Sequence, residues 1–111
     1  MSRKNRKSYI VILVVASSLK EAKKIAQALL VKKEAACVNI IRDISSFFWW
    51  QGKIQKAREV LLLIKTSNNL FNKALKTVRK GHSYSVPEII ALPIKASNKA
   101  YLEWIEEVTL D

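Results

Sequence analysis

The sequence predicts an α+β domain in which four strands form an antiparallel sheet and two helices cover one of its faces. Short segments rich in Val, Ile and Leu alternate along the chain with segments whose apolar residues recur every three or four positions. Two of the strand-like segments are joined directly at Gln51 and Gly52, which predicts a hairpin with a tight turn. Only two glycines and two prolines occur in the 111 residues, so we expect short connections between regular elements.

The first strand is predicted at residues 9–16, a short run rich in Val and Ile. Basic residues precede it, so the segment also resembles the start of a secretory signal. We favour the strand because a helix start follows at once, and cleavage there would remove part of the core. Residues 1–8 are then a flexible basic tail, and residues 9–111 form a single domain. No apolar run reaches the roughly 18 residues that a membrane-spanning helix needs, so we expect no membrane association.

Two amphipathic segments predict the helices that cover the sheet. The first spans about 19–33, because Ser18 and Glu21 have the spacing of a capping box. The second spans about 68–80, with Ser67 as a possible cap and Gly81 as the residue that ends it.

The hairpin between these helices is the most informative segment. Its arms, residues 37–50 and 53–66, are rich in β-branched and aromatic residues. At about 3.3 Å per residue, each arm spans about 46 Å, whereas a domain of this length has a radius of gyration of about 13 Å. The end of the hairpin therefore extends beyond its own domain.

That end carries four aromatic residues, 47–50, which predict a large exposed apolar patch. Such patches usually mark an interface, so we expect another copy of the chain to cover them. In the alternative interpretation, the arms break near Arg42 and Asp43, and the aromatic residues fold back over their own core.

The remaining elements complete the fold. A strand is predicted at 88–96, opened by Pro87 and interrupted by Pro93, which places it at a sheet edge or gives it a bulge. A terminal helix is predicted at about 98–109. The order β-α-β-β-α-β plus one helix is the ferredoxin-like plan.

The net charge of +11 raises nucleic acid as a partner. The basic residues are spread over every segment, however, and the last helix is acidic, so a solvated surface explains them better and nucleic acid is not expected. An RNA-recognition domain has the same element order and is the alternative function. Its sheet stacks bases on aromatic residues of two central strands, and residues 60–64 contain none.

Five residues are candidates for a site. His82, the only histidine, is the metal candidate, or else a loop histidine bonded to backbone. Cys37 is a candidate for a cleft between subunits and has a thiol suited to soft metals, but a small buried side chain explains it better. Glu59 is a lone carboxylate between charged and apolar runs, and it either pairs with a lysine or, as the family resemblance given below implies, lines a cleft between subunits. Trp50 and Tyr84 either wall that cleft or serve as plain packing, which we favour.

Catalysis is not expected. The sequence has no Ser-His-Asp set in a strand-turn-helix context, no glycine-rich phosphate loop and no plausibly spaced carboxylate pair. We therefore predict a protein that is not an enzyme. The single cysteine fits a reducing compartment.

Several motifs together resemble the CutA family of divalent-ion tolerance proteins, over about residues 10–109. They are residues 35–40, 49–54 with Glu59 beyond them, 64–66, 82–90 and 101–105. The resemblance implies a cytoplasmic homotrimer of ferredoxin-like subunits, whose long hairpins reach over neighbouring subunits. It also implies a link to copper and divalent-ion tolerance, and an architecture similar to PII-type signalling proteins.

The chain departs from the family at the proposed copper site. Bacterial members with that site place a cysteine at the end of the first strand and two adjacent histidines before the tyrosine of the later motif. Here those positions hold Ala16, Gly81 and His82. The soft thiolate that copper(I) prefers is missing, so we expect copper or another divalent metal to bind weakly, and no other cofactor.

Overall fold

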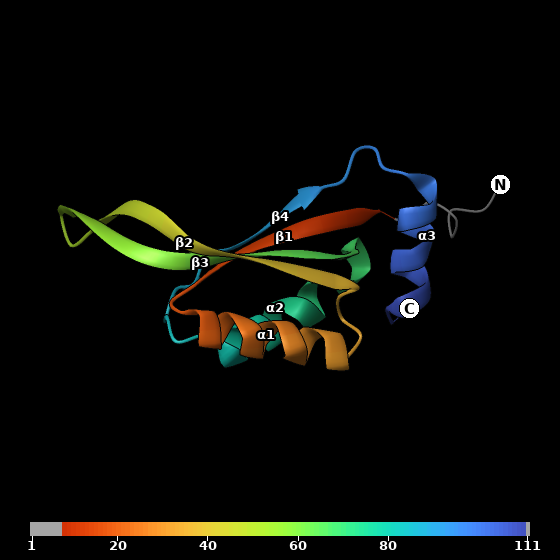
Figure 1. The fold of residues 1–111 in the computed structure, drawn as a ribbon, viewed down its shortest axis with the longest axis horizontal. Coiled ribbons are helices and arrows are strands. Elements are labelled where there is room, and N and C mark those ends of the chain that lie inside the picture. The colour runs from red at the N-terminus through yellow and green to blue at the C-terminus, as the bar shows by residue number, and fades with distance from the viewer. Residues whose placement is uncertain (1–7, 111) are drawn as a thin grey trace.

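The structure, a computed structural model, describes residues 8–110. Figure 1 shows its two layers, a twisted sheet with two helices packed on one face and a third helix beyond one end. The predicted α+β, ferredoxin-like order is confirmed. The elements are β1 (Tyr9–Ala16), α1 (Leu19–Val31), β2 (Cys37–Trp50), β3 (Lys53–Ser67), the 3₁₀ turn η2 (Asn68–Leu70), α2 (Phe71–Gly81), β4 (Ile89–Pro93) and α3 (Lys99–Val108).

The sheet has the order β2-β3-β1-β4, and every neighbouring pair is antiparallel. Side chains alternate between the two faces of the central strands, as strand geometry requires. Ile12, Val14, Leu62 and Ile64 point towards the helices and are fully buried. The core therefore lies between the sheet and the helical layer formed by α1 and α2.

Helix α1 begins as predicted. The Glu21 amide donates to Ser18 Oγ at 3.1 Å, while the Glu21 carboxylate accepts from the Ser17 amide at 3.0 Å. The carboxylate thus reaches one residue further back than in the usual capping box. The helix ends at Val31, two residues earlier than expected, and the chain then turns through Lys33 with φ of 57°.

Helix α2 ends at Gly81 as predicted, but for a different reason. Gly81 does not have the positive φ of a left-handed cap. A Cβ added there would lie 3.3 Å from Cγ1 of Ile25, which is tight. The glycine therefore allows α2 to approach α1 closely. At its other end, α2 follows the 3₁₀ turn, and Ser67 makes no side-chain capping bond to that turn.

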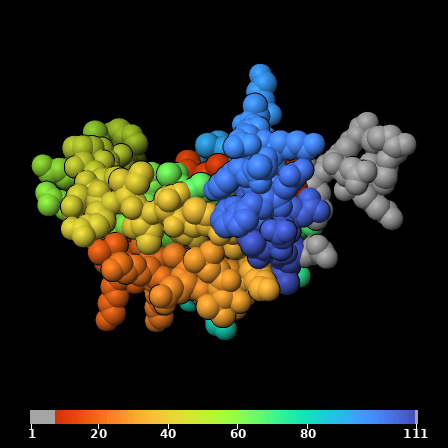
Figure 2. Space-filling model, turned by 45° about the vertical axis from the view of Figure 1, so that its right-hand side comes forward, coloured from red at the N-terminus to blue at the C-terminus, as the bar shows by residue number. Residues whose placement is uncertain are grey.

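The hairpin extends beyond the helical layer (Figures 1 and 2). Gln51 and Gly52 have φ of 50° and 78°, as a tight turn of two left-handed residues needs. The register shifts between Ile41 and Ile44 in a β-bulge, yet pairing continues to the end of both arms. The molecule measures 53 × 26 × 22 Å, so the bulge bends the ribbon without folding it back over the core.

The aromatic end of the ribbon is exposed in the single chain. The exposed fractions of Phe47, Phe48, Trp49 and Trp50 are 70%, 40%, 72% and 56%. The prediction of a projecting apolar end is therefore confirmed, and the fold-back interpretation is wrong.

The last strand and helix are shorter than expected. β4 is an edge strand, as its prolines predict. It ends at Pro93, which pairs with Ile10 next to the first residue of β1, and the Ile94 amide then donates to the Tyr9 carbonyl at 2.9 Å. Asn98 caps α3 by accepting from the Ala100 amide. The Tyr9 hydroxyl donates to Glu106 at 2.8 Å and ties α3 to the sheet.

The face of the sheet opposite α1 and α2 is apolar. Strand alternation points Leu13, Leu61 and Leu63 to this face. Ile90 and Leu92 of β4 are 47% and 49% exposed. The central strands carry only one ring on this face, Tyr9, so the aromatic platform that RNA-recognition domains use is not formed by residues 8–110.

Two expectations concern regions at the margins of the fold. Residues 1–7 of the predicted tail lie outside the described residues, but the Ser8 carbonyl accepts from the Asn68 amide at 2.8 Å. Within 8–110, each helix is too short or too polar to cross a bilayer.

Candidate functional site

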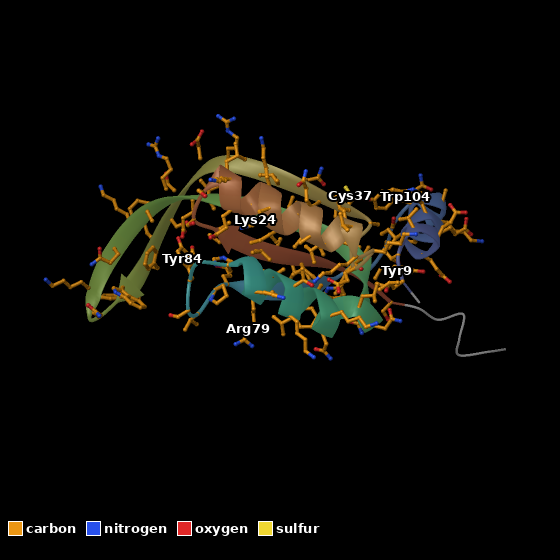
Figure 3. All side chains as sticks on the ribbon, turned by 90° about the horizontal axis from the view of Figure 1, so that it is seen from below. Tyr9, Lys24, Cys37, Arg79, Tyr84 and Trp104 are labelled. Carbon is orange, nitrogen blue, oxygen red and sulfur yellow. The ribbon has the colours of Figure 1, made fainter. Side chains whose placement is uncertain are left out.

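A cavity of about 790 Å³ lies between the hairpin ribbon and the segment that follows α2. Trp50 and Glu59 reach it from the two arms of the ribbon, and Tyr84 reaches it from the segment after α2. In Figure 3, Tyr84 lies between the ribbon and the helical layer. Three of the four residues predicted to line a cleft therefore meet in one cavity.

The fourth predicted cleft residue, Cys37, lies at the other end of the sheet, near α3 (Figure 3). Its Sγ is 3.9 Å from Lys65 Nζ and 3.8 Å from Asn39 Oδ1. Burial, and then the proximity of Cys37, raise the pKa of the Tyr101 phenol. Cys37 therefore belongs to the contact between β2 and α3 rather than to the cavity.

Glu59 and Tyr84 form the polar centre of the cavity. The Tyr84 hydroxyl donates to Glu59 Oε2 at 2.6 Å, and Glu59 is only 6% exposed. Burial, followed by the hydrogen bond to Glu59 and its charge, raises the pKa of Tyr84 to about 12. The ring itself is 38% exposed, so one side of it stays available for contact.

His82 holds the cavity wall in place. Its side chain is fully buried, and its Nε2 lies 2.7 Å from the Val15 carbonyl, to which it donates. Its Nδ1 accepts from the Tyr84 amide at 3.1 Å, and the two rings are 4.9 Å apart. One histidine thus fixes Tyr84 against β1.

Glu21 connects this wall to the start of α1. Its Oε1 accepts from the Ser83 amide at 3.0 Å. Burial favours a raised pKa for Glu21, but the hydrogen bonds from Ser17 and Ser83 and the proximity of His82 lower its pKa below the usual value. The carboxylate therefore stays charged and pins the segment after α2 to the helix.

The metal site implied by the family resemblance does not fit these residues. Ala16 and Gly81 offer no side-chain donor, and both ring nitrogens of His82 already have hydrogen-bond partners. Within residues 8–110, His, Cys, Asp and Glu side chains do not gather in groups of three that could hold an ion. A metal at His82 would have to displace one of the two bonds that position Tyr84.

Other residues that line the cavity are not predicted by the sequence patterns. Val15, Lys56 and Glu88 also line it. Two signals could have found more of it. Ser46 and Phe48 share the cavity with Trp50, as the two-residue period of a strand implies, although Phe47 lines it as well. Glu88 lies in the same motif as Tyr84. No sequence pattern predicts Val15 as a cavity residue, because it lies in an apolar run that is typical of a buried strand.

Comparison with known proteins decides the family. The family described as CutA1 divalent ion tolerance protein matches residues 10–108. The chain belongs to the CutA family. A curated CutA protein from rice, described as chloroplastic, is 44% identical over 100 residues, which cover 90% of this chain and 56% of the rice protein. The chain thus spans little more than half the length of that relative.

Solved CutA structures share the fold throughout. The divalent cation tolerance protein from Thermus thermophilus has a TM-score of 0.89 at 42% identity, covering 91% of this chain and 98% of that one. The protein described as periplasmic CutA from Archaeoglobus fulgidus has a TM-score of 0.88 at 46% identity, covering 90% and 97%. Because CutA relatives are described from different compartments, a cytoplasmic location stays a prediction, as does the absence of enzymatic activity.

The Glu59–Tyr84 bond predicts unusual alkaline behaviour. Because its folded pKa is above the ordinary 10.0, neutral Tyr84 stabilises the fold below pH 10, and this contribution disappears as pH rises through about 12. We expect the Tyr84 phenol to titrate near pH 12 rather than near pH 10, as the difference in phenolate absorbance between the unmodified chain and Tyr84→Phe will show. In Glu59→Gln, this Tyr84 component should move towards pH 10. A Tyr84 component that titrates near pH 10 in the unmodified chain would contradict the bond.

Proposed function

We propose that the chain acts in divalent-cation tolerance as a homotrimer, and that the cavity takes a small ligand or a segment of a partner protein where subunits meet. The observation that carries this proposal is the position of the cavity. One of its walls is the aromatic end of the ribbon, which projects beyond its own subunit. A neighbouring subunit that covers the ribbon therefore also closes the cavity.

The apolar surface of the single chain supports assembly. The ribbon exposes four aromatic side chains, and the open face of the sheet exposes Ile90 and Leu92 beside the central leucines. A stable monomer rarely exposes apolar areas of this size. Copies of the same chain offer both surfaces to each other, as closed cyclic assemblies require.

The lining of the cavity indicates the chemistry of its ligand. Phe48, Trp50 and Tyr84 provide ring faces, while Glu59 and Glu88 provide carboxylates. Such a site suits a partly apolar ligand with a hydrogen-bond donor or a cationic group. Recognition of such a ligand between subunits would make the protein a sensor similar in design to PII-type proteins.

The assembly is tested by light scattering on the full chain. One chain has a mass of 12.7 kDa, so the proposal expects about 38 kDa, three times that value, at micromolar concentration. A mass that stays near 12.7 kDa at these concentrations would remove the basis of the intersubunit cavity.

Copper is expected to bind this chain more weakly than it binds relatives with the full ligand set. Only one of the three family positions carries a donor, and that donor, His82, is already bonded through both nitrogens. Calorimetric titration should show no tight stoichiometric uptake. Tight uptake that disappears in a folded His82→Gln variant would show that the histidine gives up a hydrogen bond for the metal.

A further inference from the structure

The outer surface of the helical layer concentrates positive charge. We define this layer as residues 17–34 and 68–83, which include α1 and α2. It contains nine cationic side chains and two carboxylates. The cations are Lys20, Lys23, Lys24, Lys32, Lys33, Lys73, Lys76, Arg79 and Lys80.

This layer accounts for nearly all the excess charge of the described residues. Residues 8–110 contain sixteen cations and eight carboxylates, an excess of eight, and the helical layer alone has an excess of seven. The remainder of the described chain is close to neutral. The basic residues that are dispersed along the sequence therefore gather on one side of the molecule.

These nine cations are available for contact. All nine are exposed. Among residues 8–110, the structure pairs none of them with a carboxylate. Both carboxylates of the layer bond to uncharged groups within it. Glu21 bonds to the segment after α2, and the buried Glu34 accepts from Thr77 Oγ1 at 2.5 Å.

Helix geometry points the cations outward. The apolar faces of α1 and α2 pack into the core through Ala22, Ile25, Leu29, Ala74 and Val78. The lysines and Arg79 occupy the opposite faces. Figure 3 looks onto this layer, with Lys24 on one helix and Arg79 projecting from the other. Figure 2 shows long side chains of the orange helix α1 extending away from the body.

The dimensions of the layer match a nucleic-acid duplex. α1 has 13 residues and α2 has 11, so at 1.5 Å per residue the layer is about 20 Å long. About 20 Å of duplex carries about 12 phosphates, at one charge per 1.7 Å. Nine cations over that length approach the charge density of the phosphate backbone.

The chemistry of the layer disfavours other polyanions. Single strands are bound by stacking bases on aromatic rings, and the only ring besides His82 in this layer is Phe71, which packs against the core. Bilayer-binding helices insert an apolar face, whereas here only Leu30 and Val31, at one end of α1, are exposed apolar residues.

We propose that the outer surface of the helical layer binds the phosphate backbone of double-stranded nucleic acid without reading its sequence. The basic residues are dispersed along the sequence, which disfavours nucleic acid as a partner, but the fold gathers nine of them on one surface. This inference does not depend on the proposed cavity function, because the cavity and the aromatic ribbon lie outside the layer.

The experiment measures the binding of a fluorescent 24-base-pair DNA duplex to the full chain by anisotropy, between 50 and 200 mM salt. Contact with about six phosphates predicts an affinity loss of about 10³-fold over that range. In Lys24→Gln/Lys76→Gln/Arg79→Gln, the log–log salt slope should become less steep by about 2.7, and affinity at 50 mM should fall at least about thirtyfold. Glutamine keeps helix propensity, so circular dichroism should be unchanged.

A matched control separates location from net charge. Lys53→Gln/Lys95→Gln/Lys99→Gln removes the same number of exposed cations outside the layer. It should leave the salt slope unchanged. The proposal would be overturned if both triple variants lost the same affinity for the duplex. It would also be overturned if the unmodified chain bound a single strand of the same length as tightly as it binds the duplex.

Two further results would also overturn it. One is layer-dependent binding to phosphatidylserine vesicles without binding to the duplex, which would make an anionic bilayer the partner. The other is the absence of duplex binding at 50 mM salt, which would make the layer a solvated surface.

Discussion

Trp50→Ala is expected to weaken the association of subunits by about 2 kcal/mol for each subunit interface that contains Trp50. This corresponds to an increase of about thirtyfold in the dissociation constant of that interface. Trp50 is 56% exposed in the single chain and stands at the end of the ribbon, where the cavity opens. Large aromatic residues that become buried between subunits contribute most to association. Light scattering over a dilution series should therefore show the variant dissociating at concentrations where the unmodified chain stays assembled.

Val31→Ala provides the control for this experiment. Val31 is 81% exposed, but it lies on α1, away from the ribbon. Its replacement should leave the dilution curve unchanged, and far-ultraviolet circular dichroism should show both variants folded. If the Trp50→Ala curve coincides with that of the unmodified chain, the ribbon has no part in assembly.

His82→Ala is expected to lower the free energy of unfolding by about 3 kcal/mol. The substitution removes a fully buried ring, deprives the Val15 carbonyl of its donor and leaves the Tyr84 amide without its acceptor. Lost packing adds to the cost of these unpaired groups. The measurement is guanidinium unfolding at one fixed protein concentration, because dissociation and unfolding are linked in an oligomer.

Ser83→Ala is the matched control for His82. Ser83 is the next residue and it is exposed. Its hydroxyl lies 3.2 Å from Ser17 Oγ and also bonds to the Glu21 carboxylate, which keeps its bond from the Ser83 amide when the hydroxyl is removed. It should change stability by no more than about 0.5 kcal/mol. If His82→Ala were equally mild, His82 would not be the residue that positions Tyr84, and its nitrogens would be free for another role.

Local patterns predicted the elements of this fold well. The Gln51-Gly52 pair and the β-branched arms predicted the hairpin, and Ser18 with Glu21 predicted the start of α1. Gly81 shows the limit of such patterns. A glycine that ends a helix suggests a left-handed cap, whereas here its missing Cβ makes room for Ile25 of another helix.

The cavity and the charged layer depend on contacts that no local pattern contains. Glu59 and Tyr84 are 25 positions apart, and their bond depends on the bend of the ribbon and on His82. Naming them as cleft residues relied on the family resemblance rather than on spacing. Cys37, grouped with them, lies instead against α3. The dispersed lysines likewise became one surface only when α1 and α2 were placed side by side.

The central claim is that the ribbon ends against another copy of the chain. A crystal structure of the assembled full chain tests it most directly. We predict that the side chains of Trp49 and Trp50 in each subunit are buried against a second subunit, which also closes the cavity around Glu59. A crystal in which these rings face solvent, or pack only against their own subunit, would contradict the account.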